Sequence, residues 1–272
     1  MTCCSVVRHT STGCVALAVF ALGVARGHDT WVQTATNVVR PGDVVHVDFC
    51  LGNHGNGHRD FKLAGKLSSL DGATLVVRSP GGVEIDLRPT LVDLGSAPRE
   101  GYWSGRFVTA GAGLHTVSHT LDKLHRTTRA VKSCKTYVLV SESLDELAPP
   151  TNEHAVPLGH PFELVVETHP VIGCGPGNEI RVRLLHQGRP LPDHVVTFIP
   201  RGATLATDFD PEHERRTDAE GRCSFTPRQG TPILVVAHLK NPDERGEGYD
   251  ATAYTAALVI NVPERRPGRE ED

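Results

Sequence analysis

Residues 25–33 read Ala-Arg-Gly-His-Asp-Thr-Trp-Val-Gln and place a histidine directly after small residues. The apolar run Gly13 to Ala25 precedes this stretch and is typical of the hydrophobic part of a secretory signal peptide. It is shorter than the ~20 apolar residues that span a bilayer. We therefore expect residues 1–27 to form a signal peptide that is cleaved on export; the alternative is a buried helix. Cleavage would leave His28 at or next to the mature amino terminus.

Two cleavage positions fit the small-residue rule, and both predict a metal site. Cleavage after Gly27 makes His28 residue one, so its α-amine and ring Nδ1 can hold one ion. An α-amine has an ordinary pKa of ~7.7–8.0 and deprotonates readily. Cleavage after Ala25 leaves Arg-Gly-His, in which the amine, two backbone amides and the ring make a square-planar site. Such sites favour Ni²⁺ or Cu²⁺. The alternative is that His28 merely begins a strand.

Other residues are candidates to complete or orient this site. His54 lies in the glycine-rich stretch 51–60. His115 and His119 stand four residues apart in a strand-like stretch, ~13 Å along a strand. They would share a face without holding one ion together, and one of them could meet His28 across a sheet. We expect Asp29 and Trp31 to pack beneath the metal site and orient it.

Four cysteines, Cys50, Cys134, Cys174 and Cys223, follow the expected signal peptide. In an exported chain they can form two disulfides, with three possible connectivities. The expected pairing is Cys50 with Cys134 and Cys174 with Cys223, which keeps each bridge within one half of the chain. The alternative is four separate buried thiols, which pack as small apolar groups.

The composition excludes several function classes. The 272 residues carry a net charge of −4 and no long basic run, so we expect no nucleic-acid partner. No Gly-x-Ser-x-Gly, His-Glu-x-x-His or phosphate-binding loop motif occurs. No second apolar run approaches membrane length, so we expect no transmembrane segment in the mature chain. The expected location is the periplasm or the extracellular space.

Period-two alternation and Gly/Pro turns predict that the elements that position these residues are strands throughout. Expected strands cover 44–49, 73–78, 83–87, 105–108, 114–120, 136–140, 162–167, 179–185, 194–199, 223–225, 233–238 and 253–262. One short helix is expected near 143–147. The predicted fold class is all-β, with two consecutive β-sandwich domains, the second immunoglobulin-like. The domains are expected at 28–147 and 162–262, joined by a linker at 148–161 and followed by a disordered tail at 263–272.

The order of several motifs resembles a known family. His28-Asp29-Thr30-Trp31 follows the signal peptide, and Lys135 to Val140 ends the first region. Gly188 to Phe198 and Thr217 to Arg222 follow in the second region. This pattern is similar to the exported family labelled domain of unknown function 4198, which is related by name to periplasmic components of nickel uptake. The resemblance implies metal handling in the cell envelope and a membrane transport component as partner.

These observations together predict an exported protein that binds a transition-metal ion, Ni²⁺ or Cu²⁺, as a carrier or accessory to metal uptake. Its metal ligands would be drawn from His28, His54, His115 and His119. One alternative is an enzyme that uses a copper ion held by an amino-terminal histidine for oxidative chemistry. The other is a metal-free adhesion or carbohydrate-binding module.

Overall fold

The structure, a computed structural model, describes residues 28–55, 72–98, 100–147, 150–206 and 208–265. The described chain is built from strands, and its helices are two three-residue 3-10 turns, Arg88–Thr90 and Glu153–Ala155. The predicted all-β class is therefore confirmed. The expected signal peptide, residues 1–27, and most of the expected tail lie outside the described residues.

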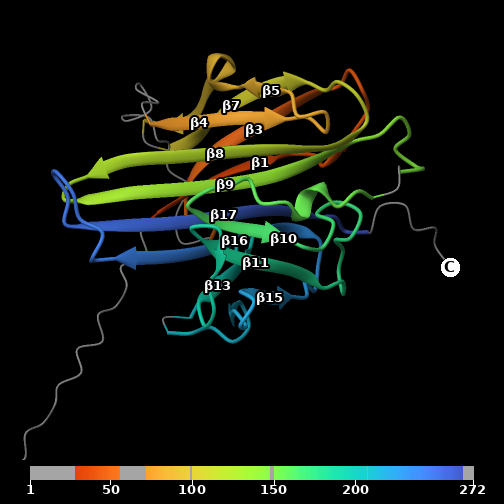
Figure 1. The fold of residues 1–272 in the computed structure, drawn as a ribbon. Helices are drawn as coiled ribbons and strands as arrows, with labels where there is room; N and C mark the ends of the chain where they lie inside the picture. Colours follow the sequence, from red (N-terminus) through yellow and green to blue (C-terminus); the bar gives the residue numbers. More distant parts are fainter. Residues whose placement is uncertain (1–27, 56–71, 99, 148–149, 207, 266–272) are drawn as a thin grey trace, which may run out of the picture.

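A central sheet of nine strands runs through both predicted domains (Figure 1). Its order is β14-β13-β16-β17-β9-β8-β4-β5, and β2 pairs with the end of β9. The strands are β2 (Val38–Val39), β4 (Ala73–Arg78), β5 (Glu84–Asp86), β8 (Gly113–His125), β9 (Thr128–Val140), β13 (Val195–Pro200), β14 (Glu214–Arg216), β16 (Thr231–Asn241) and β17 (Ala251–Val262).

Two four-stranded sheets complete the fold. One has the order β1-β3-β7-β6, with bounds Asp29–Thr34, Val44–Gly52, Glu100–Val108 and Val92–Ala97. The other contains β10 (Phe162–Val166), β11 (Ile180–His186), β12 (Arg189–Pro190) and β15 (Arg222–Phe225). In Figure 1 they lie on either side of the central sheet. The fold is thus a pair of β-sandwiches that share their middle layer.

The parallel pairing of β9 with β17 joins the two halves of the chain. Residues 128–135 of β9 align with 251–258 of β17. The Thr136 hydroxyl adds a hydrogen bond to the carbonyl of Val259 at 3.0 Å. All other main pairings of the central sheet are antiparallel, apart from the short contact of β2. This pairing joins the strands β14-β13-β16-β17 to the strands β9-β8-β4-β5 and so forms the continuous central sheet.

Alternation along the central strands divides the apolar side chains between two cores. On β17, Ala257 and Val259 face the sheet of β1 and β3, and the apolar side chains between these layers form what we call the first core. Ala256, Leu258 and Ile260 face the sheet of β10 and β11, and the apolar side chains there form the second core. Because successive side chains of a strand point to opposite faces, one strand can serve both cores. The central strands consequently read as continuous apolar runs.

A fully buried ion pair fixes the segment that connects the two halves. Lys135 on β9 lies 2.5 Å from the Glu163 carboxylate on β10, and both side chains are at most 2% exposed. The same carboxylate accepts backbone N–H groups from Leu158, Gly159 and His160 at 2.7 to 3.1 Å. Burial raises the pKa of Glu163, but the Lys135 ammonium and the Leu158 N–H lower it more, so the group stays ionised.

The expected disulfides are not formed. Cys50, Cys134, Cys174 and Cys223 are all thiols. The Cys134 sulfur accepts the backbone N–H of Val32 at 3.4 Å, and the Cys174 thiol donates to the carbonyl of His169 at 3.6 Å. Burial raises the pKa of Cys134 and of Cys223 to about 12, so both stay protonated. The alternative of separate thiols that pack as small apolar groups is the correct one.

The prediction of a short helix near 143–147 is also wrong, since residues 144–146 form bends. The Ser143 hydroxyl accepts the backbone N–H groups of Asp145 and Glu146 at 3.2 and 3.0 Å, which turns the chain without starting a helix. Local side-chain bonds of this kind compete with helix formation. The strand predicted at 73–78, in contrast, coincides with β4.

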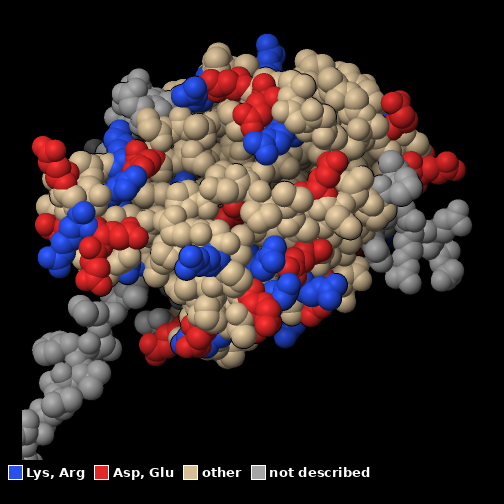
Figure 2. Space-filling view, viewed as in Figure 1, with Lys and Arg blue, Asp and Glu red and all other residues tan. Residues whose placement is uncertain are grey.

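Acidic and basic side chains are interspersed on the surface. Figure 2 shows Lys and Arg beside Asp and Glu over one face, separated by wide uncharged areas. Several are paired, such as Arg78 with Glu84 and Arg129 with Asp122. Within the described residues, no helix has the length and apolar character needed to cross a bilayer.

Removal of the Lys135 ammonium should strongly destabilise the fold. In Lys135→Met the Glu163 carboxylate would remain buried without its cation, which typically costs about 3 kcal/mol of unfolding free energy. Urea unfolding followed by circular dichroism measures this change. Lys240→Met, at an exposed position of β16, is the matched control and should change stability by less than about 0.5 kcal/mol. Equal urea midpoints for the two variants would contradict a structural role for the ion pair.

Candidate metal centre at the amino terminus

A polar row crosses the central sheet just below the start of β1. Lys132 on β9 aligns with Thr255 on β17, and Thr255 aligns with His238 on β16. By strand alternation all three side chains lie on the face of the sheet that carries the first core. Strand β1 packs on this same face. With His28 and Asp29 these residues form what we call the amino-terminal cluster.

Asp29 and His238 are joined by the shortest contact of the cluster. The His238 Nε2 donates to the Asp29 carboxylate at 2.7 Å, and the two side chains are 33% and 8% exposed. Asp29 itself is fixed by the ladder between β1 and β3, where it pairs with Gly52. His194 steadies the strand from the other side, since its Nε2 lies 2.9 Å from the carbonyl of His238.

The Asp29 contact selects one tautomer of His238. A neutral imidazole whose Nε2 donates a hydrogen bond has its lone pair on Nδ1. A histidine oriented in this way by a carboxylate is the usual arrangement of a metal-binding histidine. The cluster therefore has a ring whose direction is set and whose Nδ1 is the basic nitrogen.

Lys132 holds the backbone of His28. Its ammonium donates to the His28 carbonyl at 2.9 Å. Burial lowers the pKa of Lys132, and the nearby Asp29 carboxylate opposes that effect. His28 is exposed, whereas the six residues of β1 that follow it are largely buried. His28 is therefore an exposed residue that is tethered through its carbonyl.

His54 lies in the core. Its ring is fully buried, meets the ring of Trp31 edge-on with centroids 5.6 Å apart, and contacts the Ile199 carbonyl through Nδ1 at 2.8 Å. Its carbonyl accepts the backbone N–H of Gly202 at 3.0 Å, with His54 at φ 60°. His54 thus joins the end of β3 to the end of β13. Its ring is buried and has no access to solvent.

His115 and His119 share one face of β8, as the strand pattern predicts, and both are buried. The His119 ring packs on Phe49 with centroids 4.3 Å apart, and its Nδ1 lies 2.7 Å from the Thr74 carbonyl. Burial lowers the pKa of His119 to about 4 and also lowers that of His115. Both are neutral rings of the first core at neutral pH.

Trp31 is fully buried and anchors β1 in the first core, beside the cluster. Within the described ranges, no three His, Cys, Asp or Glu side chains are grouped as ligands of one ion. The cluster holds the His238 ring, oriented by the Asp29 carboxylate, and the backbone of His28, which Lys132 tethers. Neither Lys132 nor His238 was expected from the sequence, since their contacts with His28 and Asp29 join residues 104 and 209 positions apart.

Comparison with known proteins gives one match to a family. The family described as "Domain of unknown function (DUF4198)" matches residues 25–241, which is most of the chain. No curated protein matches the chain.

Solved structures give only faint likenesses. The D0-D1 domain of intimin is 11% identical with a TM-score of 0.22, over 86% of this chain and 98% of that one. The Yersinia pseudotuberculosis adhesin InvE is 16% identical with a TM-score of 0.21, over 86% and 59%. A DUF4785 family protein from Legionella pneumophila is 10% identical with a TM-score of 0.29, over 76% and 52%. Scores this low carry no functional argument.

The buried neutral histidines should make the fold sensitive to mild acid. The pKa of His119 is about 4 in the folded protein against an ordinary 6.5. Between these values the unfolded chain binds a proton that the folded chain does not, so the unfolding free energy falls as pH drops, by at most ~3 kcal/mol for this ring. His169, also lowered to about 4, adds to the effect.

Urea unfolding at about pH 7 and about pH 5 measures this dependence. His119→Leu should be less stable at neutral pH, because the bond to Thr74 is lost, yet should lose less stability on acidification. His125→Leu, at an exposed position of the same strand, should keep the full dependence of the parent protein. An undiminished pH dependence in His119→Leu would show that this ring is protonated in the folded state.

Proposed function

We propose that this chain, which belongs to the family described as "Domain of unknown function (DUF4198)", is an exported transition-metal-binding protein of the cell envelope. It would act as a carrier or accessory to metal uptake, with a membrane transport component as partner. The observation that carries the proposal is the Asp29–His238 hydrogen bond directly beside the exposed His28. Cleavage of the signal peptide would add an α-amine to this setting.

The ligand chemistry fits Ni²⁺ or Cu²⁺. If cleavage follows Gly27, the amine and Nδ1 of His28 offer two nitrogen ligands, and His238 Nδ1 is the candidate third. If cleavage follows Ala25, the first three residues offer four nitrogens. Nitrogen ligands of this kind suit both ions. The tether from Lys132 to the His28 carbonyl restricts the terminal residue, which lowers the entropy lost when an ion binds.

His54, His115 and His119 take no part in the proposed site. Each ring has a core neighbour and a backbone carbonyl within hydrogen-bond distance of its Nδ1. Recruiting them would require opening the first core. Their burial leaves His28 and His238 as the candidate ligands.

Titration of the exported, purified protein with Cu²⁺ or Ni²⁺ in a calorimeter tests the proposal. We expect one ion per chain with a dissociation constant below the micromolar range. His28→Ala should weaken binding by on the order of 100-fold, and His238→Ala and Asp29→Asn by ~10–100-fold, because Asp29 orients the His238 ring. His125→Ala, at an exposed strand end, is the control and should bind as the parent does.

Two results would contradict the proposal. One is a parent protein that takes up neither ion. The other is a His28→Ala variant that binds as tightly as the parent. Turnover of peroxide by the copper-loaded protein would instead favour the enzymatic alternative.

A further inference from the structure

A hollow lies at the edge of the second sandwich, away from the amino-terminal cluster. It has a volume of about 540 Å³ and opens between the ends of β13, β14 and β15. Hollows of ~300–1,000 Å³ are the usual size of small-molecule sites. Phe225 and Ile233 form its inner wall, and both are buried in the second core. The hollow is therefore backed by fixed side chains.

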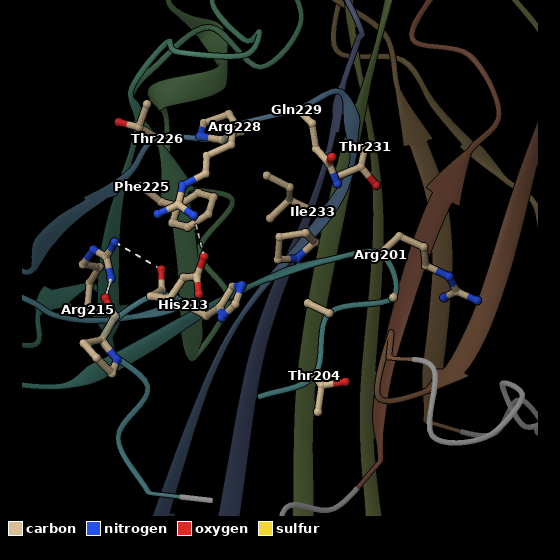
Figure 3. Close-up of a pocket in the computed structure, with 16 residues that line it drawn as sticks. Arg201, Thr204, His213, Arg215, Phe225, Thr226, Arg228, Gln229, Thr231 and Ile233 are labelled. Carbon is tan, nitrogen blue, oxygen red and sulfur yellow. Dashed lines mark hydrogen bonds and ion pairs between the residues drawn. The ribbon is translucent and has the colours of Figure 1, made fainter. Parts of the chain in front are cut away.

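One fixed positive charge stands beside this wall. The Arg215 guanidinium donates to the carbonyls of Pro211, Glu212 and Glu214 at 2.7 to 3.3 Å. It also lies over the Phe225 ring, 5.7 Å from the centroid. These contacts use three of its five N–H donors and hold its charge in place. In Figure 3, Arg215 lies on one side of the hollow, and Arg201, whose guanidinium extends outward, lies on the other.

A second arginine meets a carboxylate of the protein itself. Arg228, from the connection between β15 and β16, pairs with Glu212, from the segment before β14, at 2.9 Å. The two side chains are 85% and 56% exposed, and an exposed pair of this kind is weak. Both residues line the hollow, so the Glu212 carboxylate lies where a bound anion would meet Arg228.

The rest of the lining suits a molecule with a polar and an apolar part. Thr226, Gln229 and Thr231 add hydroxyl and amide groups, and Figure 3 shows them along the same rim as Arg228. Besides His213, the lining residues with ionisable side chains are Arg201, Arg215, Arg228 and Glu212. Because the Arg201 guanidinium extends outward, the charges at the hollow are those of Arg215 and Arg228 against Glu212. The hollow is therefore net positive, which disfavours cations and favours an anion.

We infer that this hollow binds a small carboxylate-bearing molecule with an apolar body. Its carboxylate replaces that of Glu212 on Arg228, and the fixed charge of Arg215 adds to the attraction. A planar guanidinium matches a carboxylate in geometry. Arg228 already donates a hydrogen bond to the Glu212 carboxylate in this way. The apolar body faces Phe225 and Ile233. This site is independent of the proposed metal site.

The two partners of the ion pair give opposite outcomes. Arg228→Gln removes the group that meets the carboxylate and should weaken binding by at least about tenfold. Glu212→Gln removes the competitor and should strengthen binding by about two- to fivefold. Asp193→Asn breaks another exposed pair of the same half, with Arg216, and should leave binding unchanged. The Glu212→Gln variant keeps the backbone carbonyl that accepts the Arg215 hydrogen bond, so Arg215 should stay in place.

Nuclear magnetic resonance titration of the full exported chain with phenylacetate is the experiment. Saturable shifts of the Thr226, Gln229 and Thr231 amides are expected, with the order of affinity Glu212→Gln, parent, Arg228→Gln. Neutral phenylacetamide should bind at least about tenfold more weakly, and inorganic phosphate, which lacks the apolar body, should also bind more weakly. Absence of saturable shifts in both the parent and Glu212→Gln would overturn the inference, as would equal affinities of the acid and its amide.

Discussion

The parallel pairing of β9 with β17 is the constraint on which the rest of the structure depends. Each half of the chain ends in one of these strands, and their contact closes two small sheets into one layer. Both cores are built against this layer, one on each face. Without the pairing, each sandwich would expose an edge strand rich in apolar residues, and an exposed edge of that kind promotes aggregation.

The two faces of β9 carry different polar groups for different purposes. Lys132 points to the face under β1 and tethers His28. Lys135, an odd number of residues later, points to the opposite face and pairs with Glu163. One strand thus holds the start of the first sandwich and the connection into the second. The amino-terminal cluster is a consequence of this layout, since Thr255 lies between Lys132 and His238 only because β17 separates β9 from β16.

Local patterns in the sequence were enough for the fold class and for most strands. The alternating run at 73–78 and the apolar run at 253–262 are strands with nearly the expected bounds. The sheet order could not be predicted in the same way, because pairing of β9 with β17 joins residues more than 100 positions apart. The strand β6, Val92–Ala97, is largely exposed, and its alternation of Val92, Asp93 and Leu94 is too short to indicate a strand. The predicted disulfides are not formed, because the number of cysteines and an expected export do not determine where each thiol packs.

In the candidate site, too, local sequence patterns predict some placements, while others depend on long-range contacts. Asp29 and Trp31 lie in the first strand, and His28 immediately precedes it. The shared face of His115 and His119 follows from the strand pattern, but the pattern does not reveal that these rings and His54 lie in the core. His238 lies at the end of an apolar strand, and only the Asp29 contact reveals a role for it.

The central claim is that maturation creates a metal site from the terminal residue and the ring that Asp29 orients. Native mass spectrometry of the exported protein, with Cu²⁺ or Ni²⁺ at micromolar concentration, tests it most directly, because one spectrum reports both the first residue and the number of ions bound. We expect a chain that starts at His28 or Arg26 and carries one ion. A chain that retains its first 25 residues, or a mature chain that stays metal-free, would contradict the claim.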